Sequence, residues 1–154
     1  MVQAQQECRV TRGNFDLAGQ TFTVSAPWGK LRLRMPLLGR HQLENAATAL
    51  AGLHALQEQG VVVSRAALTR GFRSVNWPGR LEVLRRSPLV VADGAHNPYS
   101  AGKLREALRD YFPFKRLVYV VGCSADKNIA GIIQELAVGA DLVVATRSRH
   151  PRAV

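Results

Sequence analysis

The sequence predicts an α/β protein, in which a hairpin and an Ala-rich helix come first and a parallel sheet of alternating strands and helices comes second. Three observations support this fold class. Apolar and polar residues alternate over 21–35, apolar residues recur at helical spacing over 42–59, and short apolar runs alternate with helical segments from residue 81 onward. Period-two alternation indicates a half-buried strand, and a period near 3.6 indicates an amphipathic helix. Strands that alternate with helices favour parallel pairing with right-handed crossovers.

The chain has 154 residues, which suits one domain, or one small domain joined to part of another. Its apolar fraction of 47 % excludes a disordered tail. No apolar stretch reaches the length that a bilayer requires, and the first residues lack a signal-peptide core. We therefore expect a cytoplasmic protein with no membrane association.

The charge of the chain is strongly positive, with 21 basic and 11 acidic side chains and a formal net charge of +10. Such a field attracts polyanions, including nucleic acids, nucleotides and small molecules with several carboxylates. Aromatic residues make up only 6 % of the chain, and they show no cluster on which bases would stack. A basic nucleic-acid-binding module remains an alternative function.

The two cysteines, Cys8 and Cys123, belong to no Cys/His ligand pattern. We expect two reduced, buried thiols, and we assign no metal ligand within this chain.

After Gly39, the spacing of the apolar residues changes from every second residue to helical spacing. Trp77 and the two residues after it, Pro78 and Gly79, interrupt the helical spacing. A domain boundary is therefore expected near residue 73, which gives one domain over 1–72 and another over 73–154. The expected elements of the first domain are strands at 21–25 and 30–35, a helix over 42–59 that ends at Gly60, and a helix over 65–70 that Ser64 caps and Gly71 ends.

The second part of the chain alternates strand and helix. Its expected elements are strands at 81–84 and 89–92, a helix from Asn97 and Pro98 to Phe112, a strand at 117–121, a helix over 128–138 and a strand at 142–145. The last three strands are continuous apolar runs, which are typical of a parallel sheet covered on both faces. Two helices cannot cover such a sheet, so we expect the chain to be part of a longer protein.

Two polar loops follow strands at the edge where open parallel sheets bind ligands. In the first loop, Asp93 stands directly at a strand end, Gly94 frees the backbone, and His96 precedes a helix whose N–H groups could face a phosphate. The simpler interpretation is that Asp93 and Asn97 only cap the turn and the helix, with His96 on the surface.

The second loop offers a hydroxyl, a carboxylate and a cation together, on Ser124, Asp126 and Lys127. A lysine at the start of a helix is unfavourable for the helix dipole unless it meets an anion such as a phosphate. A solvated surface lysine is the alternative.

Several catalytic patterns are absent from the sequence. It has no GxxxxGK[ST] loop, no GxGxxG after a strand and no Ser-His-Asp or Cys-His arrangement. Glu82 and Asp93 could form a carboxylate pair, although Glu82 could equally be solvated within a strand. His41, His54 and His150 lack ligand spacing, and His54 has the position of a packed histidine on a helix stripe.

Taken together, several segments resemble the Mur ligase superfamily. MPLLGRHQLENA at 35–46 resembles the segment that closes the central domain of these enzymes. WPGRLE at 77–82, followed by DGAHNP at 93–98, looks like the folylpolyglutamate synthase/dihydrofolate synthase branch. SADK at 124–127 and HPRA at 150–153 also fit that branch, whereas peptidoglycan ligases carry related but different residues. The resemblance covers nearly the whole chain from Gly13 onward.

The resemblance implies a Rossmann-like parallel sheet of the Mur ligase C-terminal type, preceded by a hairpin and a helix from the end of the central ATPase domain. It implies an ATP-dependent ligase that joins L-glutamate to a folate or to dihydropteroate. ATP phosphorylates the carboxylate, and the amine attacks the acyl phosphate, which releases ADP and phosphate. Another Mur-type amide ligase is the nearest alternative, and a non-catalytic scaffold is a third.

The resemblance also implies roles for individual residues. Asn45 is expected to recognise the adenine, and Arg80 is expected to contact the phosphates. Asp93 and His96 are expected near the ribose and the phosphates, and Lys127 near the transferred phosphoryl group. Ser124 and Asp126 are expected to contact the substrate. Of these, Asp93, His96 and Lys127 are the expected catalytic residues. The phosphate-binding loop, the Mg²⁺ ligands and much of the folate site of the family lie in an N-terminal portion outside this chain. We therefore expect a monomeric enzyme in the longer protein and no activity in this part alone.

Overall fold

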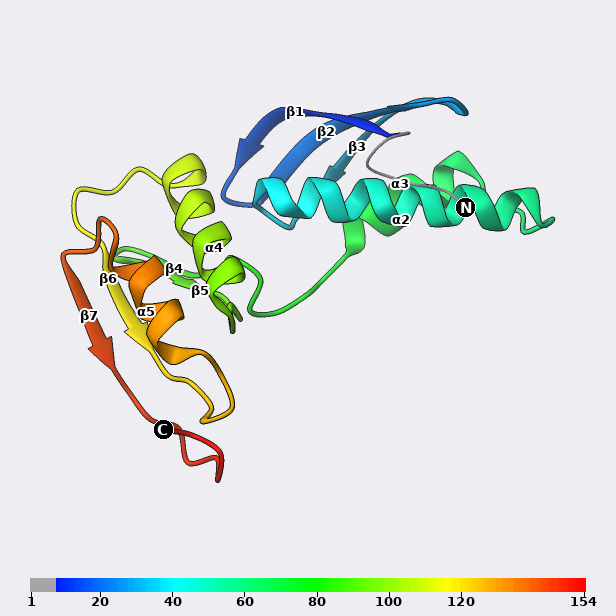
Figure 1. The fold of residues 1–154 in the computed structure, drawn as a ribbon. Coiled ribbons are helices and arrows are strands. Elements are labelled where there is room, and N and C mark those ends of the chain that lie inside the picture. Colours follow the sequence, from blue (N-terminus) through cyan, green and yellow to red (C-terminus); the bar gives the residue numbers. More distant parts are fainter. Residues whose placement is uncertain (1–7) are drawn as a thin grey trace. The chain divides into compact units, whose positions relative to one another are not determined.

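The computed structural model describes residues 8–154 and is drawn in Figure 1. The chain forms two compact units, of which the first ends at Ala92 and the second begins at Asp93. The domain boundary expected at residues 72/73 stays a prediction. Among residues 8–154, no helix is both long enough and apolar enough to cross a bilayer.

The first unit begins with an antiparallel three-stranded sheet in the order β1-β2-β3, formed by β1 (Arg9–Asp16), β2 (Gly19–Ala26) and β3 (Gly29–Met35). The predicted hairpin is therefore confirmed, and β1 adds a third strand to it. Gly19 opens β2 with a φ of 140°, and a Cβ at this position would overlap the Met35 carbonyl. Only glycine fits this turn without strain.

The helices α2 (Arg40–Glu58) and α3 (Arg65–Ser74) cover one face of this sheet (Figure 1). Alternate residues of the strands point toward the helices, as period-two alternation requires. The core that results contains Phe22, Val24, Leu33 and Met35 from the sheet and Leu43, Ala46, Ala47, Leu50 and Ala51 from α2. The predicted Ala-rich helix is thus confirmed.

Gly71 does not end the second helix, contrary to expectation, because α3 continues to Ser74. Phe72 gives the physical reason. Its ring meets the Phe22 ring edge-on, with centroids 5.8 Å apart, so packing keeps the last turn helical. Ser64 caps the helix as predicted, and its side chain accepts a hydrogen bond from Ala67 N.

The first unit ends with a hairpin of β4 (Glu82–Arg86) and β5 (Leu89–Ala92), which pair with each other in antiparallel fashion. The sequence predicted that 89–92 would be buried on both faces. This is wrong for the described residues, in which Leu89 is 36 % and Val90 41 % exposed. Within residues 8–92, the helices α2 and α3 pack against the β1–β3 sheet and not against this hairpin.

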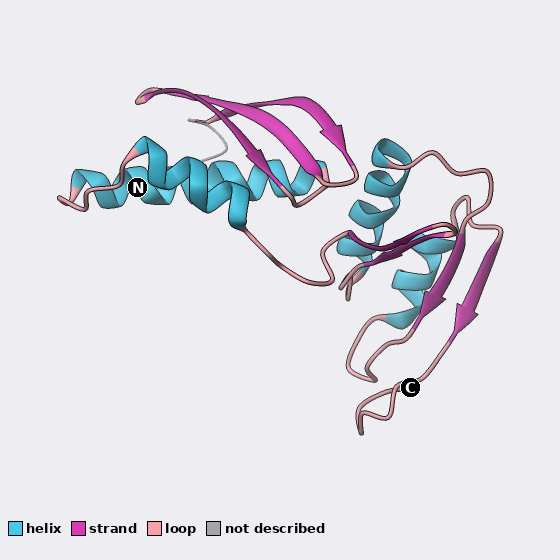
Figure 2. Cartoon of the chain, turned by 180° about the vertical axis from the view of Figure 1, so that it is seen from behind, coloured by secondary structure: helices cyan, strands magenta, loops and turns pink. Residues whose placement is uncertain are grey.

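The second unit contains α4 (Pro98–Tyr111), β6 (Val118–Val121), α5 (Ile129–Ala137) and β7 (Leu142–Ala145), as Figure 2 shows by element type. β6 and β7 pair in parallel, with Val118 opposite Leu142 and Val121 opposite Ala145. The predicted parallel pairing is confirmed for β6 and β7. The expected third strand of that sheet, β5, instead pairs with β4 in antiparallel fashion, in a separate sheet.

Among the described residues, helices cover only one face of this parallel sheet. Tyr119 is buried, whereas its neighbours Val118 and Val120 are 46 % and 69 % exposed. Leu142 and Val144 of β7 are exposed in the same way. The prediction of burial on both faces is therefore wrong for residues 93–154, because alternate side chains of each strand face away from the helices.

Both cysteines are free thiols, as predicted. Cys8 is buried, but Cys123 is only half-buried, so the expectation of two buried thiols is correct for Cys8 alone.

Candidate functional site

The second unit places the two predicted polar loops side by side, at the starts of α4 and α5. Gly131 lies in the first turn of α5, and a Cβ built on it would come within 2.6 Å of Cγ of Pro98, the first residue of α4. The two helix starts are therefore in close contact. Unpaired N–H groups and the helix dipole make such a start favourable for an anion.

The start of α4 is held by a reciprocal pair of hydrogen bonds. Asn97 Oδ1 accepts from Ser100 N at 2.8 Å, and Ser100 Oγ accepts from Asn97 N at 3.1 Å. Ser100 Oγ also accepts from His96 N at 3.0 Å. This capping box confirms the predicted helix start and fixes the backbone of the residue that carries the candidate imidazole.

Asp93 folds the turn before this helix. Its Oδ1 accepts a hydrogen bond from Ala95 N at 2.8 Å, and the residue is half-buried. The capping contacts of the simpler interpretation are therefore present at both Asp93 and Asn97. A catalytic or nucleotide-binding role of Asp93 stays a prediction.

His96 is exposed, and its ring is oriented by the backbone. Nδ1 lies 3.1 Å from the carbonyl oxygen of Gly94. A carbonyl can only accept, so in the neutral ring Nδ1 carries the proton and Nε2 presents its lone pair. The ring can therefore accept a hydrogen bond from a ligand at the start of α4.

The second loop holds its own ion pair. Lys127 Nζ lies 2.8 Å from Asp126 Oδ2, and Lys127 N donates to the carbonyl oxygen of Ser124 at 3.1 Å. The hydrogen bond from Lys127 lowers the pKa of the Asp126 carboxyl below its usual value. An incoming anion must compete with this carboxylate for the ammonium group of Lys127.

The segment 150–154 packs along the same loop. Ala125 N donates to Arg152 O at 2.8 Å, and Val154 N donates to Cys123 O at 3.1 Å. The charge of Arg152 also lowers the pKa of Asp126. Arg152 thus lies beside the candidate site, and no role was expected for it, although HPRA at 150–153 was one of the segments that carried the resemblance.

Asn45 and Arg80 belong to the first unit, so the structure describes each only in its own surroundings. Asn45 is exposed on α2, where its Nδ2 lies 3.3 Å from Gln42 Oε1. The Arg80 guanidinium lies over the Trp77 ring, 5.6 Å from its centroid. Their expected roles at the adenine and the phosphates stay predictions.

Glu82 has a structural partner beside Arg80, since its Oε2 accepts from Gly79 N at 2.8 Å. This contact holds the turn before β4. The carboxylate pair of Glu82 and Asp93 stays a prediction.

Two of the other histidines, His54 and His150, have structural partners. The ring of His54 stacks on Trp28 with centroids 4.3 Å apart, which confirms a packed histidine, and Nδ1 of His150 accepts from Arg152 N at 3.2 Å. Within residues 8–154, no group of three or more His, Cys, Asp or Glu side chains is placed to share a metal ion.

Comparison with known proteins identifies the family. The family model described as "Mur ligase, glutamate ligase domain" matches residues 79–154. A dihydrofolate synthase/folylpolyglutamate synthase of Mycobacterium tuberculosis is 36 % identical over 151 residues, which cover 96 % of this chain and 31 % of that protein. A Bacillus subtilis protein of the same name is 33 % identical over 122 residues, covering 79 % of this chain and 28 % of its own length.

Solved structures agree with these relatives. Mycobacterium tuberculosis folylpolyglutamate synthase complexed with ADP superposes with a TM-score of 0.86 at 37 % identity, over 96 % of this chain and 33 % of that one. Escherichia coli FolC in complex with DHPP and ADP gives a TM-score of 0.78 at 32 % identity, over 96 % and 33 % of the two chains.

The chain spans about a third of the length of these relatives, 31 % of the first one. Within that span, the family match, the two sequence relatives and the two structures agree with the motifs and with the parallel β6–β7 pair. Residues 79–154 therefore form a glutamate ligase domain of the Mur ligase family, and the chain as a whole is similar to folylpolyglutamate synthase/dihydrofolate synthase proteins.

Proposed function

We propose that this chain is part of an ATP-dependent ligase that joins L-glutamate to a folate through an acyl phosphate, with residues 1–72 ending its central ATP-binding domain and residues 73–154 forming its glutamate-side domain. One observation carries the proposal. The contact between Pro98 and Gly131 brings together two helix starts, one preceded by His96 and the other by Lys127. The relatives named as folylpolyglutamate synthases, and the ADP bound in two of their structures, support the choice of reaction.

In the proposed reaction, the folate carboxylate attacks the γ-phosphorus of ATP and ADP leaves. The amine of glutamate then attacks the carbonyl carbon of the acyl phosphate, loses a proton and displaces phosphate. Negative charge develops on the transferred phosphoryl group, so fixed positive groups aimed at it stabilise the transition state. The starts of α4 and α5 and the ammonium of Lys127 are such groups.

Lys127 and Asp126 have linked roles in this proposal. When the Lys127 ammonium turns to the phosphoryl group, the Asp126 carboxylate loses its 2.8 Å partner. It can then accept hydrogen bonds from the amino group of glutamate, beside the hydroxyl of Ser124. The two partners of one ion pair would thus bind the two reactants.

Asp93 and His96 are proposed to contact the ribose and phosphate region. The lone pair on Nε2 of His96 suits a hydroxyl donor, and the carbonyl of Gly94 holds the ring in that tautomer. Asn45 and Arg80 are proposed to contact the adenine and the phosphates.

Mg²⁺ is expected in the reaction, but residues 8–154 do not fit it, because they form no cluster of three or more ligating side chains. The Mg²⁺ ligands are therefore expected in the part of the longer protein outside these residues. We further propose a monomeric enzyme of the cytoplasm, where the two free thiols would stay reduced.

The test uses the intact polypeptide of which this chain is a part, with Mg²⁺, ATP and L-glutamate. Glutamate-dependent ADP release is measured with dihydropteroate and, separately, with tetrahydrofolate. We expect turnover in the parent and a fall on the order of 10²-fold in both His96→Ala and Lys127→Ala, since each removes a group aimed at the reacting phosphates.

Lys115→Ala is the matched control, because Lys115 is an exposed lysine of the same unit outside both loops. It should leave turnover unchanged. Full activity of His96→Ala and Lys127→Ala would refute the proposed site. Absence of turnover with either pterin substrate would refute the proposed folate reaction.

A further inference from the structure

Basic and hydroxyl side chains gather on the side of the β1–β3 sheet that faces away from α2. The strand register aligns them in two neighbouring rows across the sheet, each with one residue from every strand. The six residues, which we call the cation face, are Arg9, Ser25 and Lys30 in one row and Thr11, Thr23 and Arg32 in the next.

The cation face is open within the first unit. The residues that alternate with it along the strands, such as Val24 and Leu33, point into the core, so its own side chains point the other way. Arg9, Lys30 and Arg32 are all exposed. In Figure 1, α2 and α3 cover the opposite side of the sheet. These two helices therefore leave the three cations accessible to a ligand.

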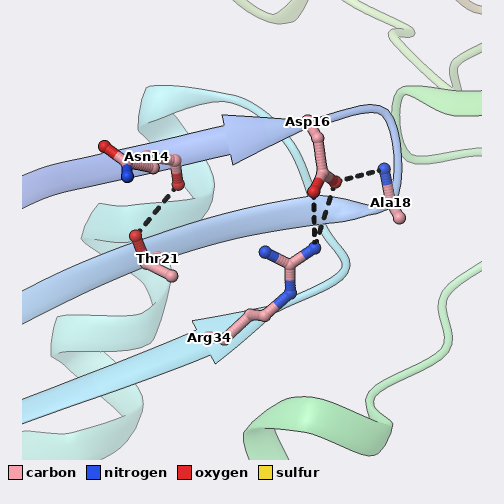
Figure 3. Close-up of polar contacts among 5 residues, drawn as sticks. All are labelled: Asn14, Asp16, Ala18, Thr21 and Arg34. Carbon is pink, nitrogen blue, oxygen red and sulfur yellow. Dashed lines mark hydrogen bonds and ion pairs between the residues drawn. The ribbon is translucent and has the colours of Figure 1, made fainter.

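The described residues do not neutralise the charge of the cation face. The carboxylate of Asp16 lies at the end of β1, but it pairs with Arg34, whose Nη2 is 3.0 and 3.1 Å from its two oxygens (Figure 3). Within residues 8–154, no hydrogen bond or ion pair joins a carboxylate to Arg9, Lys30 or Arg32. The surface therefore presents three cations without a counter-charge.

Cations interleaved with hydroxyls are the side chains with which proteins contact the phosphates of nucleic acids. Arg and Lys supply charge, and Ser and Thr donate further hydrogen bonds to the phosphate oxygens. Lys30 lies about 7 Å from Arg32 along one strand and about 10 Å from Arg9 across two strands. A nucleic-acid duplex carries one charge per about 1.7 Å of its axis. Its phosphates are therefore dense enough to reach all three cations at once.

Other acidic partners fit the cation face less well. A single strand binds through aromatic side chains that stack on its bases, and a membrane surface through apolar side chains that enter the lipid. A protein interface likewise has apolar and aromatic side chains at its centre. The cation face consists of arginine, lysine, serine and threonine alone, so it offers none of these anchors.

We propose that the cation face binds a nucleic-acid duplex through its phosphates. Contacts to phosphates carry no sequence information, so the binding has no preference for sequence. This is a second activity of the chain. It depends on the β1–β3 sheet alone, and it stands or falls independently of glutamate ligation.

The test titrates a fluorescently labelled DNA duplex with the 154-residue chain and follows the anisotropy at about 50 and about 200 mM salt. Three phosphate contacts predict a slope of about −2.7 for the logarithm of the association constant against the logarithm of the salt concentration. This slope is a loss of about 40-fold in affinity between the two salt concentrations. Duplexes of unrelated sequence should bind equally.

The triple variant Arg9→Gln, Lys30→Gln, Arg32→Gln should weaken binding at the lower salt by at least about tenfold. It should also reduce the steepness of the salt dependence by about one for each cation removed. The matched control replaces three exposed arginines of α3, as Arg65→Gln, Arg70→Gln, Arg73→Gln, and changes the net charge by the same amount. It should change the affinity less than about threefold, because salt screens charges that do not contact the duplex. Circular dichroism checks that both triple variants are folded.

An equal loss of affinity in both triple variants would overturn the proposal, since net charge and not the cation face would then cause the binding. So would a preference for one duplex sequence, or tighter binding to the single strand or to vesicles of phosphatidylserine and phosphatidylcholine. The intact polypeptide of which this chain is a part should bind the duplex as the chain does. If it does not, the rest of the polypeptide covers the cation face and the proposal is wrong.

Discussion

Gln20 is a polar side chain that is fully buried, and its amide joins the sheet to the start of α2. Nε2 donates to the carbonyl oxygens of Leu37 at 2.7 Å and of Gly39 at 3.0 Å. Gln20→Leu would leave these acceptors without that donor. We expect a loss of about 1–3 kcal/mol in the free energy of unfolding, measured by denaturant titration.

Gln57→Leu is the control, because Gln57 makes the same type of bond at the surface, with Nε2 donating to Val63 O at 2.9 Å. Water replaces that bond when it is lost, so we expect little change. If the two variants lose equal stability, burial is not the cause of the effect at Gln20.

The lowered pKa of the Asp16 carboxyl makes the free energy of unfolding depend on pH. A hydrogen bond from Ala18 N and, next, one from Arg34 hold its pKa below the ordinary value of 3.8 (Figure 3). The unfolded chain keeps the ordinary pKa, so the contribution is fully present above it and is lost as pH falls through the lower folded value. Asp16→Asn should therefore show a weaker loss of stability below about pH 3.8 than the parent.

The measurement is the denaturant midpoint of the parent and the variant across the acid range. Arg34→Gln should reduce the part of the acid-induced loss of stability that comes from Asp16 without abolishing it, because the hydrogen bond from Ala18 N to Asp16 remains. Identical acid profiles of the parent and Asp16→Asn would contradict the prediction.

At single positions, the sequence could identify reactive groups but not their partners. His96 and Lys127 stood out because polar loops after strands are candidate sites in parallel sheets. The pairing of Lys127 with Asp126 needs side-chain positions that no spacing gives. The approach of Arg152 to that loop depends on how 150–154 folds back, which a residue pattern does not encode.

At the scale of the helix, two glycines give opposite predictions. Gly52 lies inside α2, and a Cβ built on it meets nothing within 4 Å. Gly52→Ala should raise the free energy of unfolding by about 1 kcal/mol, because alanine loses less backbone entropy in a helix. Thermal unfolding of the first unit measures the gain.

Gly131→Ala is the counterpart in α5, where the new Cβ would come 2.6 Å from Pro98 Cγ and 2.9 Å from Asn128 Nδ2. The clash should outweigh the helix preference and separate the starts of α4 and α5. A stabilised Gly131→Ala would show that the two helix starts are not in close contact.

Helix starts were the most predictable part of the elements, because local side chains determine them. Ser64 and Asn97 cap α3 and α4 as the sequence predicted. Helix ends were less predictable, since Phe72 extends α3 past Gly71 by a contact with a strand far away in the sequence. A local breaker signal yields to packing of this kind.

At the scale of the whole molecule, the fold class and the family could be predicted, but the cover of the sheets could not. A continuous apolar run such as 89–92 is typical of a strand buried on both faces. Burial, however, depends on which elements pack against the strand, and the described helices leave Leu89, Val90, Val118 and Val120 exposed. An apolar run shows that a strand is suited to burial, whereas its actual exposure depends on the elements that pack against it.

The division after Ala92 separates the tryptophans of the chain from its tyrosines. Both tryptophans, Trp28 and Trp77, precede it, and the three tyrosines at 99, 111 and 119 follow it. Tryptophan emission therefore reports on the first unit alone, and the tyrosine band of the near-ultraviolet dichroism contains the signal of the second. Without any label, one sample thus reveals whether the two units melt together or one after the other.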